Sequence, residues 1–294
     1  MSSSPVQDPS GLVYLADGSP AYAGRHVHES GYPVHSHGFL EIAVVVAGSG
    51  VHHCVTGRQR LSAGDVLVLR PGVWHGYEDC EDLALFNCCL SAGLLHRELL
   101  WMLSDPVLGH LLWAGPSSVG RRGILTARLE AGDLAEAVEH LSAVDRLKGL
   151  SLVRHRSDLV GRMTLFLGLL ARTVTEAAEP GAAGPKLIHP VILRAMRMFD
   201  ERLAHPWTLA ELAAELHLVP GSLVRLFTTS VGLPPIAYLS QRRAEVAATL
   251  LQRDDRPIAR IGELVGWPDP NYFARRFRAH LGMNASTYRR LFRH

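Results

Sequence analysis

The stretch GWPDPNYFARRFR, from Gly266 to Arg278, contains the clearest helix start in the chain. Asp269 is a typical N-cap residue, because its carboxylate can accept a hydrogen bond from a free backbone N–H of the first turn. Pro270 suits the first helical position, where a missing backbone donor costs nothing. We therefore expect a helix to begin at Pro270. Its apolar residues recur at steps of four and predict a buried face: Phe273, Phe277 and Leu281.

The other face of this predicted helix is polar and cationic. It carries Asn271, Arg275 and Arg278 at i, i+4 and i+7, with Arg276 beside them. Asparagine can form two hydrogen bonds with an adenine edge, and arginine can form two with guanine, so this stripe suits the major groove of DNA. A solvated basic helix without any ligand would have the same pattern, and the surrounding sequence decides between the two interpretations.

Charge is divided unevenly along the chain. The 294 residues are 47% hydrophobic and 20% charged with a net charge of +2, as in ordinary globular proteins. From residue 187 onward, 15 Arg and no Lys stand against 9 acidic residues, which gives +6 and leaves −4 for the preceding part. An acidic first part joined to a basic second part is typical of a regulatory domain attached to a DNA-binding domain.

The ends and the middle of the chain suggest its domain boundaries. Residues 1–22 are rich in Ser, Pro and Gly and predict a flexible arm, and the stretch EAAEPGAAGP predicts a linker over residues 176–186. Domains are then expected over residues 23–175 and 187–294. No apolar run approaches the roughly 18 to 20 residues of a membrane span. The first residues lack a signal-peptide pattern, so we expect a cytoplasmic protein with no membrane partner.

The first domain begins with a strand pattern. Short apolar runs predict strands over 41–47, 51–55, 65–70 and 83–90, with a turn at Gly48-Ser49-Gly50. Strands of this length and spacing favour a small antiparallel barrel or jelly roll. From residue 92 to about 177 the pattern is helical, and it is strongest over 152–174. We expect these helices to flank the barrel or to form a homodimer interface.

Two motifs in the first domain resemble those of the cupin superfamily. The first is H-x-H-x3-E-x6-G, formed by His35, His37, Glu41 and Gly48, and the second consists of Gly64, Gly72 and His75. The resemblance implies that His35, His37, Glu41 and His75 bind a divalent transition metal such as Zn, Ni, Fe or Mn, and these side chains are suitable ligands. The alternative is that the same residues line a pocket for an organic effector without a metal.

The second domain repeats one helical scheme. Its helices are expected over 192–203, 209–216, 221–229, 236–251, 258–265 and 270–281, and Thr208 with Glu211 forms a capping box. The short breaks predict two helix-turn-helix units that could read successive major-groove segments. The residues expected to contact DNA are Ser222, Val224, Arg225 and Thr228 in the first unit, Arg243 on the long helix, and Asn271, Arg275, Arg276 and Arg278 in the second unit.

Residues 187–293 resemble the DNA-binding domain of the AraC/XylS family of bacterial transcription regulators. The signature lies in Ile258, Ile261, Val265, Gly266, Trp267, Asp269, Tyr272, Phe273, Arg275, Phe277, Gly282, Tyr288 and Arg289. Val219 departs from it, since the first unit often has a Ser cap there, and this predicts weaker DNA reading by the first unit. The resemblance implies a regulator with a double-stranded DNA operator, a small-molecule effector in a cupin-like domain, a homodimer and RNA polymerase as partners.

Two other functions compete with this one. A cupin with three His and one Glu could be a metal-dependent enzyme fused to a DNA-binding domain. No further acid/base pair can be assigned around these residues, so we expect a regulator and not an enzyme. Cys88 and Cys89 could act as a thiol redox sensor, but adjacent cysteines form disulfides poorly.

Overall fold

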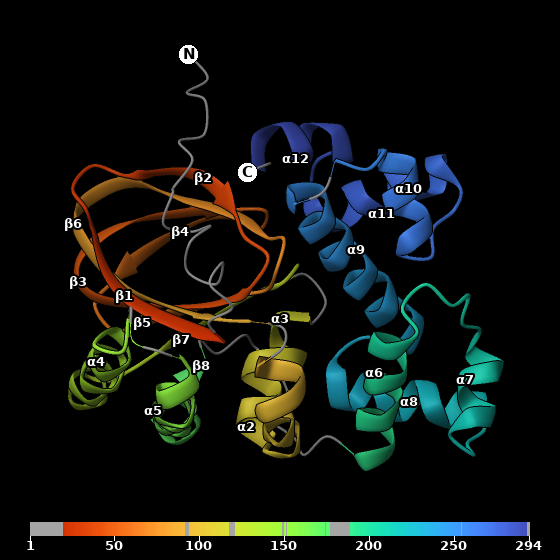
Figure 1. The fold of residues 1–294 in the computed structure, drawn as a ribbon, viewed down its shortest axis with the longest axis horizontal. Helices are drawn as coiled ribbons and strands as arrows, with labels where there is room; N and C mark the ends of the chain where they lie inside the picture. Colours follow the sequence, from red (N-terminus) through yellow and green to blue (C-terminus); the bar gives the residue numbers. More distant parts are fainter. Residues whose placement is uncertain are drawn as a thin grey trace.

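The computed structural model describes residues 20–91, 94–117, 121–148, 150, 152–173, 175–176, 189–253 and 255–292. They form two domains that lie side by side, a sheet domain (residues 20–176) and an all-helical domain (residues 189–292) (Figure 1). The predicted two-domain α+β class is therefore confirmed. The predicted arm over 1–22 and linker over 176–186 lie largely outside the described residues. None of the described helices is both long enough and apolar enough to cross a membrane.

The sheet domain contains one antiparallel sheet of eight strands. They are β1 (Ala21–His28), β2 (Tyr32–Ser36), β3 (Leu40–Cys54), β4 (Gly57–Ser62), β5 (Asp65–Leu69), β6 (Trp74–Leu90), β7 (Ile124–Arg128) and β8 (Thr175–Glu176). The order is β1-β6-β3-β5-β7-β8, with β2 paired to β6 and β4 paired to β3. Among the described strands, no pairing joins β1 to β8, so closure of the predicted barrel stays a prediction.

The strand β3 differs most from the prediction. It runs through Gly48-Ser49-Gly50, where we expected a turn, because the strand bends instead of ending. Its register with β6 shifts at three points between Val45 and Val51, as in β-bulges. Gly48 has a φ of 71°, and a Cβ there would lie 2.2 Å from the carbonyl oxygen of Asp82. Only glycine fits this bend.

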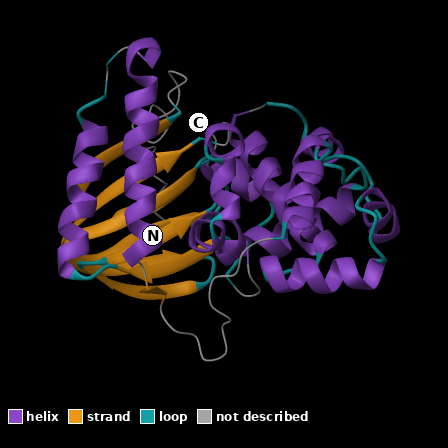
Figure 2. Ribbon diagram, turned by 90° about the horizontal axis from the view of Figure 1, so that it is seen from below, coloured by secondary structure: helices purple, strands orange, loops and turns teal. Residues whose placement is uncertain are grey.

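Helices cover one face of the sheet. The helices α4 (Ala131–Asp145) and α5 (Leu152–Thr173) lie side by side across the strands (Figure 2). Met163 and Phe166 of α5 are buried in one core with Phe86 and Cys88 of β6. The apolar stripe of α5 therefore packs on the sheet, and a homodimer stays a prediction. The remaining helical turns are η1 (Leu94–Glu98), η2 (Leu100–Ser104), α2 (Pro106–Gly109), η3 (His110–Ala114) and α3 (Gly115–Ser117).

The region predicted to be helical also contains a strand. Residues Ile124–Arg128 form β7, which pairs with β5 along its whole length. Five residues are too few for a helical period to be distinguished from an alternating one, so the apolar residues there were assigned to the wrong element.

The helical domain follows the prediction closely. Its helices are α6 (Pro190–Glu201), α7 (Leu209–Glu215), α8 (Pro220–Val231), α9 (Pro235–Arg253), α10 (Ile258–Leu264), α11 (Pro270–Leu281) and α12 (Ala285–Phe292). The Asp269 carboxylate accepts a hydrogen bond from the backbone N–H of Tyr272 at 2.6 Å, which confirms the N-cap of α11. The hydroxyl of Thr208 likewise accepts from the N–H of Glu211 at 3.1 Å.

A buried ion pair joins the two domains. The guanidinium of Arg70, just after β5, donates to both carboxylate oxygens of Glu245 on α9, at 3.3 and 3.0 Å. Arg242 donates to the same carboxylate. Burial raises the pKa of Glu245, but the charges of Arg70 and Arg242 outweigh it and hold that pKa below its ordinary value. The pair is therefore ionised at neutral pH.

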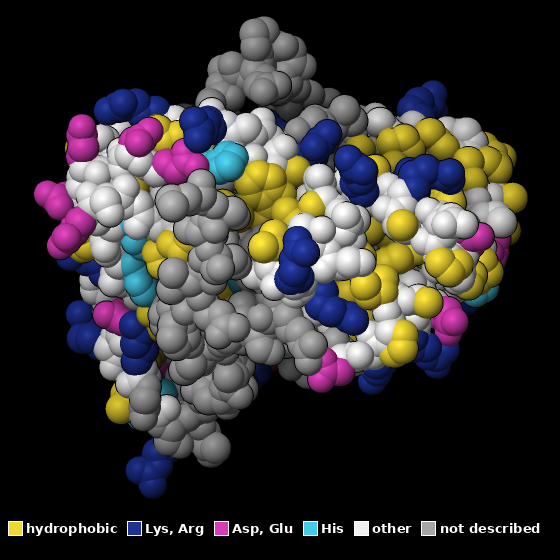
Figure 3. Space-filling model, turned by 90° about the horizontal axis from the view of Figure 1, so that it is seen from above, with side chains coloured by type: hydrophobic (Ala, Val, Ile, Leu, Met, Phe, Trp, Pro, Cys, Tyr) yellow, Lys and Arg dark blue, Asp and Glu magenta, His cyan; other side chains and the backbone are white. Residues whose placement is uncertain are grey.

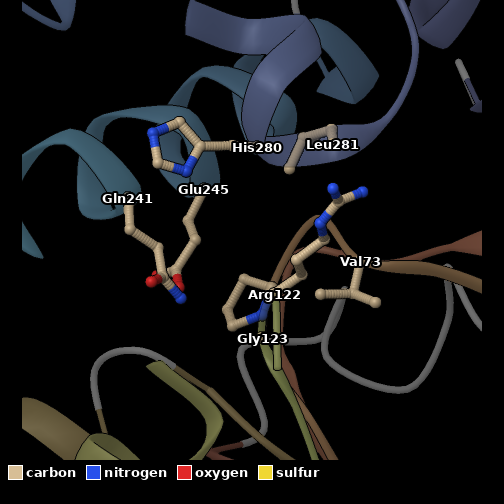
Figure 4. Close-up of a pocket in the computed structure, with 8 residues that line it drawn as sticks. Val73, Arg122, Gly123, Gln241, Glu245, His280 and Leu281 are labelled. Carbon is tan, nitrogen blue, oxygen red and sulfur yellow. The ribbon is translucent and has the colours of Figure 1, made fainter. Parts of the chain in front are cut away.

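A small pocket lined by residues of both domains lies beside this ion pair. Val73 and Arg122 enter it from the sheet domain, and Gln241 and His280 enter it from the helical domain (Figure 4). Burial and the charge of Arg276 lower the pKa of His280 to about 4. The imidazole in this pocket is therefore neutral near pH 7.

Candidate functional site

The outward face of α11 is the predicted DNA-reading surface. Asn271, Arg275 and Arg278 are exposed on it, whereas Phe273 and Phe277 are buried beneath it. The predicted division into two faces is therefore confirmed, and contact of the outer face with DNA stays a prediction. In the view from above, Lys and Arg side chains are scattered over the helical domain among hydrophobic ones (Figure 3).

Two arginines of α11 differ in their surroundings. The guanidinium of Arg275 lies 5.3 Å from the ring centre of Tyr272, so a cation–π contact orients it at the surface. Arg276 instead donates to the hydroxyl oxygen of Ser240 on α9, at 3.1 and 2.6 Å. The Arg276 side chain therefore points toward α9, away from the exposed stripe beside which we placed it.

The first unit has a weaker N-terminus, as its sequence predicts. Val219 is the N-cap residue of α8 and makes no side-chain capping bond. Arg225 is exposed on α8, while the other three predicted contacts are half-buried: Ser222, Val224 and Thr228. These four remain candidate DNA contacts.

Arg243 is placed differently from the other predicted DNA contacts. Its side chain is buried, and its guanidinium donates to the carbonyl oxygens of Leu203, Gly266 and His205, at 3.0, 3.1 and 2.6 Å. Leu203 and His205 precede the first unit, and Gly266 is the turn of the second. Arg243 therefore ties the segment before the first unit to the turn of the second, and three of its N–H donors are engaged there.

The four predicted metal or effector ligands come together at one end of the sheet. His35 of β2 pairs with His75 of β6, and Glu41 lies on the neighbouring strand β3. Candidate ligand atoms of His35, Glu41 and His75 all lie within 4.8 Å of one another. His37 stands beside them, with its Nε2 2.7 Å from a carboxylate oxygen of Glu41.

Two further residues belong to this group, and the sequence did not reveal them. His52 of β3 and Tyr77 of β6 are buried, and their ring centres lie 5.6 and 5.9 Å from that of His75. An odd separation between Glu41 and His52 predicts opposite faces of a regular strand. The bulges of β3 reverse that alternation. We call His35, His37, Glu41, His52, His75 and Tyr77 the histidine site.

Burial sets the charges in the histidine site. It lowers the pKa of His75 well below the usual value and lowers that of His52 to about 4. Burial also raises the pKa of Glu41, but the charge and hydrogen bond of His37 outweigh this and the result is a lowered pKa. The site thus holds an ionised Glu41 carboxylate together with neutral imidazoles at His52 and His75, which are the forms that bind metal ions.

Several buried polar atoms of the histidine site have no hydrogen-bond partner among the described residues. They are Glu41 Oε1, His52 Nε2, both ring nitrogens of His75 and the hydroxyl of Tyr77. A buried polar group without a partner costs about 1 to 3 kcal/mol, so such a concentration indicates that the site binds something polar. Nitrogen and carboxylate ligands of this kind fit Zn, Ni, Fe or Mn.

The cysteines do not form a reactive site. All four are buried as free thiols, and burial raises the pKa of Cys88 and of Cys89 well above the usual value. The Cys88 sulfur lies 3.5 Å from that of Met163 in the core. A thiol that stays protonated is a poor nucleophile, which disfavours the redox-sensor hypothesis.

Two families match successive parts of the chain. The family described as "AraC-like ligand binding domain" matches residues 18–148, and the one described as "Helix-turn-helix domain" matches residues 212–291. The transcriptional activator RhaR of Yersinia pestis is 26% identical over 278 residues, or 95% of this chain and 91% of RhaR. RhaR of Escherichia coli is 26% identical over 258 residues, or 87% and 86%. These relatives are activators and not enzymes, in agreement with the prediction.

Solved structures with a similar fold include ToxT from Vibrio cholerae. One ToxT structure has a TM-score of 0.53 at 11% identity and covers 92% of this chain and 98% of its own. Another, with an unsaturated fatty acid bound, has a TM-score of 0.50 at 14% identity and covers 93% and 94%. The ligand-binding and helix-turn-helix matches, the full-length likeness to activators and this fold lead to one conclusion. The chain belongs to the AraC family of transcription regulators, with an AraC-like ligand-binding domain before a helix-turn-helix DNA-binding domain.

Proposed function

We propose that this transcription activator is controlled by a divalent transition-metal ion bound at the histidine site. His35, Glu41 and His75 would hold the ion, with His37 orienting the Glu41 carboxylate and His52 at hand as a further nitrogen ligand. The main support is the set of buried polar atoms without partners around Glu41 and His75. A bound cation would give a partner to the free Glu41 carboxylate oxygen, to one ring nitrogen of His75 and to the His52 Nε2.

The DNA-reading part of the proposal rests on exposure and charge. Asn271, Arg275 and Arg278 stand on the open face of α11, and Arg225 stands on α8 with Ser222, Val224 and Thr228 beside it. We assign base contacts mainly to α11, because Asp269 caps its N-terminus. The N-cap residue of α8, Val219, makes no side-chain capping bond. Arg276 and Arg243 are left out because their guanidinium groups bind other parts of the domain.

A zinc-binding titration tests the metal assignment. Full-length protein stripped with chelator is dialysed against zinc chloride, and bound zinc per chain is measured. We expect one zinc per chain, and a loss of affinity of more than about tenfold in Glu41→Gln and in His75→Ala. His53→Ala is the matched control, because His53 follows His52 on β3 but is half-exposed beside Glu78. Absence of zinc from wild type, or equal losses in His53→Ala, would sink the assignment and point to an organic effector.

A further inference from the structure

The segments that carry the histidine site also carry contacts to the helical domain. Ser36 stands between His35 and His37, and its hydroxyl lies 2.6 Å from the hydroxyl of Tyr288 on α12. Trp74 directly precedes His75, and its indole N–H donates to the carbonyl oxygen of Leu281 at 3.0 Å. Each contact is therefore one residue away from a candidate ligand. We call these two contacts the clasp.

The hydrogen-bond geometry makes the Tyr288 contact well defined. The Tyr288 hydroxyl donates to the carbonyl oxygen of Gly72 at 3.0 Å. The side-chain amide of Gln252 donates to the Tyr288 hydroxyl oxygen at 3.3 Å. Ser36 can then act as the second donor to the same oxygen. Ser36, Gln252 and Tyr288 are all buried, so a small displacement of Ser36 leaves hydrogen-bonding groups unsatisfied.

On the helical side, the Trp74 contact of the clasp ends at α11, and the Ser36 contact ends at α12, which packs against α11. The ring of Tyr288 packs edge-on against Phe277, with ring centres 5.4 Å apart, and Phe277 belongs to the buried face of α11. Leu281 is the last residue of α11. Asn271 and Arg275 lie on the opposite face of the same helix. The histidine site and the candidate DNA-reading face are thus connected by one short series of packed residues.

We propose that the clasp couples the histidine site to α11, so that binding at the site changes the affinity of α11 for DNA through Ser36, Tyr288, Trp74 and Leu281. This inference rests on the proposed function, because it takes the histidine site to be the effector site. The coupling is reciprocal, so zinc and DNA change each other's affinity by the same factor. Substitutions away from both the clasp and the histidine site should leave that factor unchanged.

The test measures DNA affinity with and without zinc. A duplex selected from a random pool by the full-length protein is titrated in chelator and in zinc chloride, and the ratio of the two Kd values is the coupling. We expect a ratio of about fivefold or more in wild type. It should shrink in Tyr288→Phe and in Trp74→Phe and fall below about twofold in the double variant. Tyr288→Phe keeps the ring and removes the hydroxyl with its hydrogen bonds, whereas Trp74→Phe keeps an aromatic side chain but replaces the indole, with its N–H donor, by a smaller ring.

Matched controls separate coupling from general damage. Tyr238→Phe changes a buried tyrosine near Phe199 and Phe227, and Trp101→Phe changes an exposed tryptophan, both away from the clasp. The control double variant should keep the wild-type ratio, and zinc stoichiometry is measured in every variant. A clasp double variant that binds zinc and keeps the wild-type ratio would overturn the coupling but leave the proposed function standing. A wild-type protein that binds no zinc would overturn both.

Discussion

Arg243 on α9 and Gly266 in the turn before α11 are joined by a hydrogen bond of 3.1 Å from the guanidinium to the carbonyl oxygen. The same guanidinium reaches the carbonyl oxygens of Leu203 and His205 ahead of the first unit. A single side chain therefore fixes how the two helix-turn-helix units sit relative to each other. DNA reading by two helices depends on that spacing.

Replacing Arg243 with Lys should destabilise the helical domain. A lysine ammonium lacks the planar fork that reaches three carbonyl oxygens, so some of them lose their donor. We expect the free energy of unfolding to fall by about 2 to 4 kcal/mol, measured by urea denaturation. Arg260→Lys is the control, because Arg260 pairs with Glu263 at the exposed surface, and this substitution should cost under about 1 kcal/mol. Equal stability of the two variants would contradict the bracing role.

Gly266→Ala should also be destabilising. Gly266 has a φ of 82°, and a Cβ there would lie 2.6 Å from the carbonyl oxygen of Ala204. Backbone strain and steric overlap together should lower the free energy of unfolding of the full chain by about 2 to 4 kcal/mol, measured by thermal melting. Gly221→Ala is the matched control, since nothing lies within 4 Å of a Cβ in the first turn of α8. It should be neutral or stabilise by up to about 1 kcal/mol, and the reverse order would refute this description of the turn.

Arg275→Ala should weaken specific DNA binding by about 1 to 3 kcal/mol and relax the preference at one base pair. The comparison is Arg276→Ala, whose side chain bonds to Ser240. We expect that variant to retain base preference. Binding of each to the selected duplex and to single-base variants distinguishes the roles. Equal losses on specific and random DNA would make Arg275 a phosphate contact instead.

Glu245→Gln should weaken the contact between the two domains and lower the free energy of unfolding. It leaves the buried guanidinium of Arg70 without its charge partner, which should cost about 3 to 5 kcal/mol. Glu263→Gln removes an exposed pair and should cost under about 1 kcal/mol. The depressed pKa of Glu245 adds stability above the unfolded pKa of about 4.3, and this is lost as pH falls through the folded value. Wild type should therefore lose more stability on acidification than Glu245→Gln, and parallel curves would refute the ion pair's role.

Local signals explain what the sequence could predict. The start of α11 followed from Asp269 and Pro270, which depend on neighbouring residues alone. The resemblance to the cupin motifs implied that His35, Glu41 and His75 lie together, and the pairing of His35 with His75 agrees with it.

Tertiary context explains what the sequence could not predict. His52 was missed because it lies outside the two cupin-like motifs, and only the register shifts between β3 and β6 bring it beside His75. The burial of Arg243 could not be foreseen, because a buried arginine with carbonyl partners looks like a surface arginine in a helical pattern. The clasp joins Ser36 to Tyr288 across 252 residues, a contact that no spacing rule contains.

The most direct test of the account is the DNA affinity of the full-length wild-type protein and of His75→Ala, each measured in chelator and in zinc chloride on the selected duplex. We expect zinc to change the wild-type Kd by about fivefold or more and to leave the His75→Ala value unchanged. A wild-type protein that binds one zinc per chain yet has the same Kd in both conditions would contradict control of DNA binding by the histidine site.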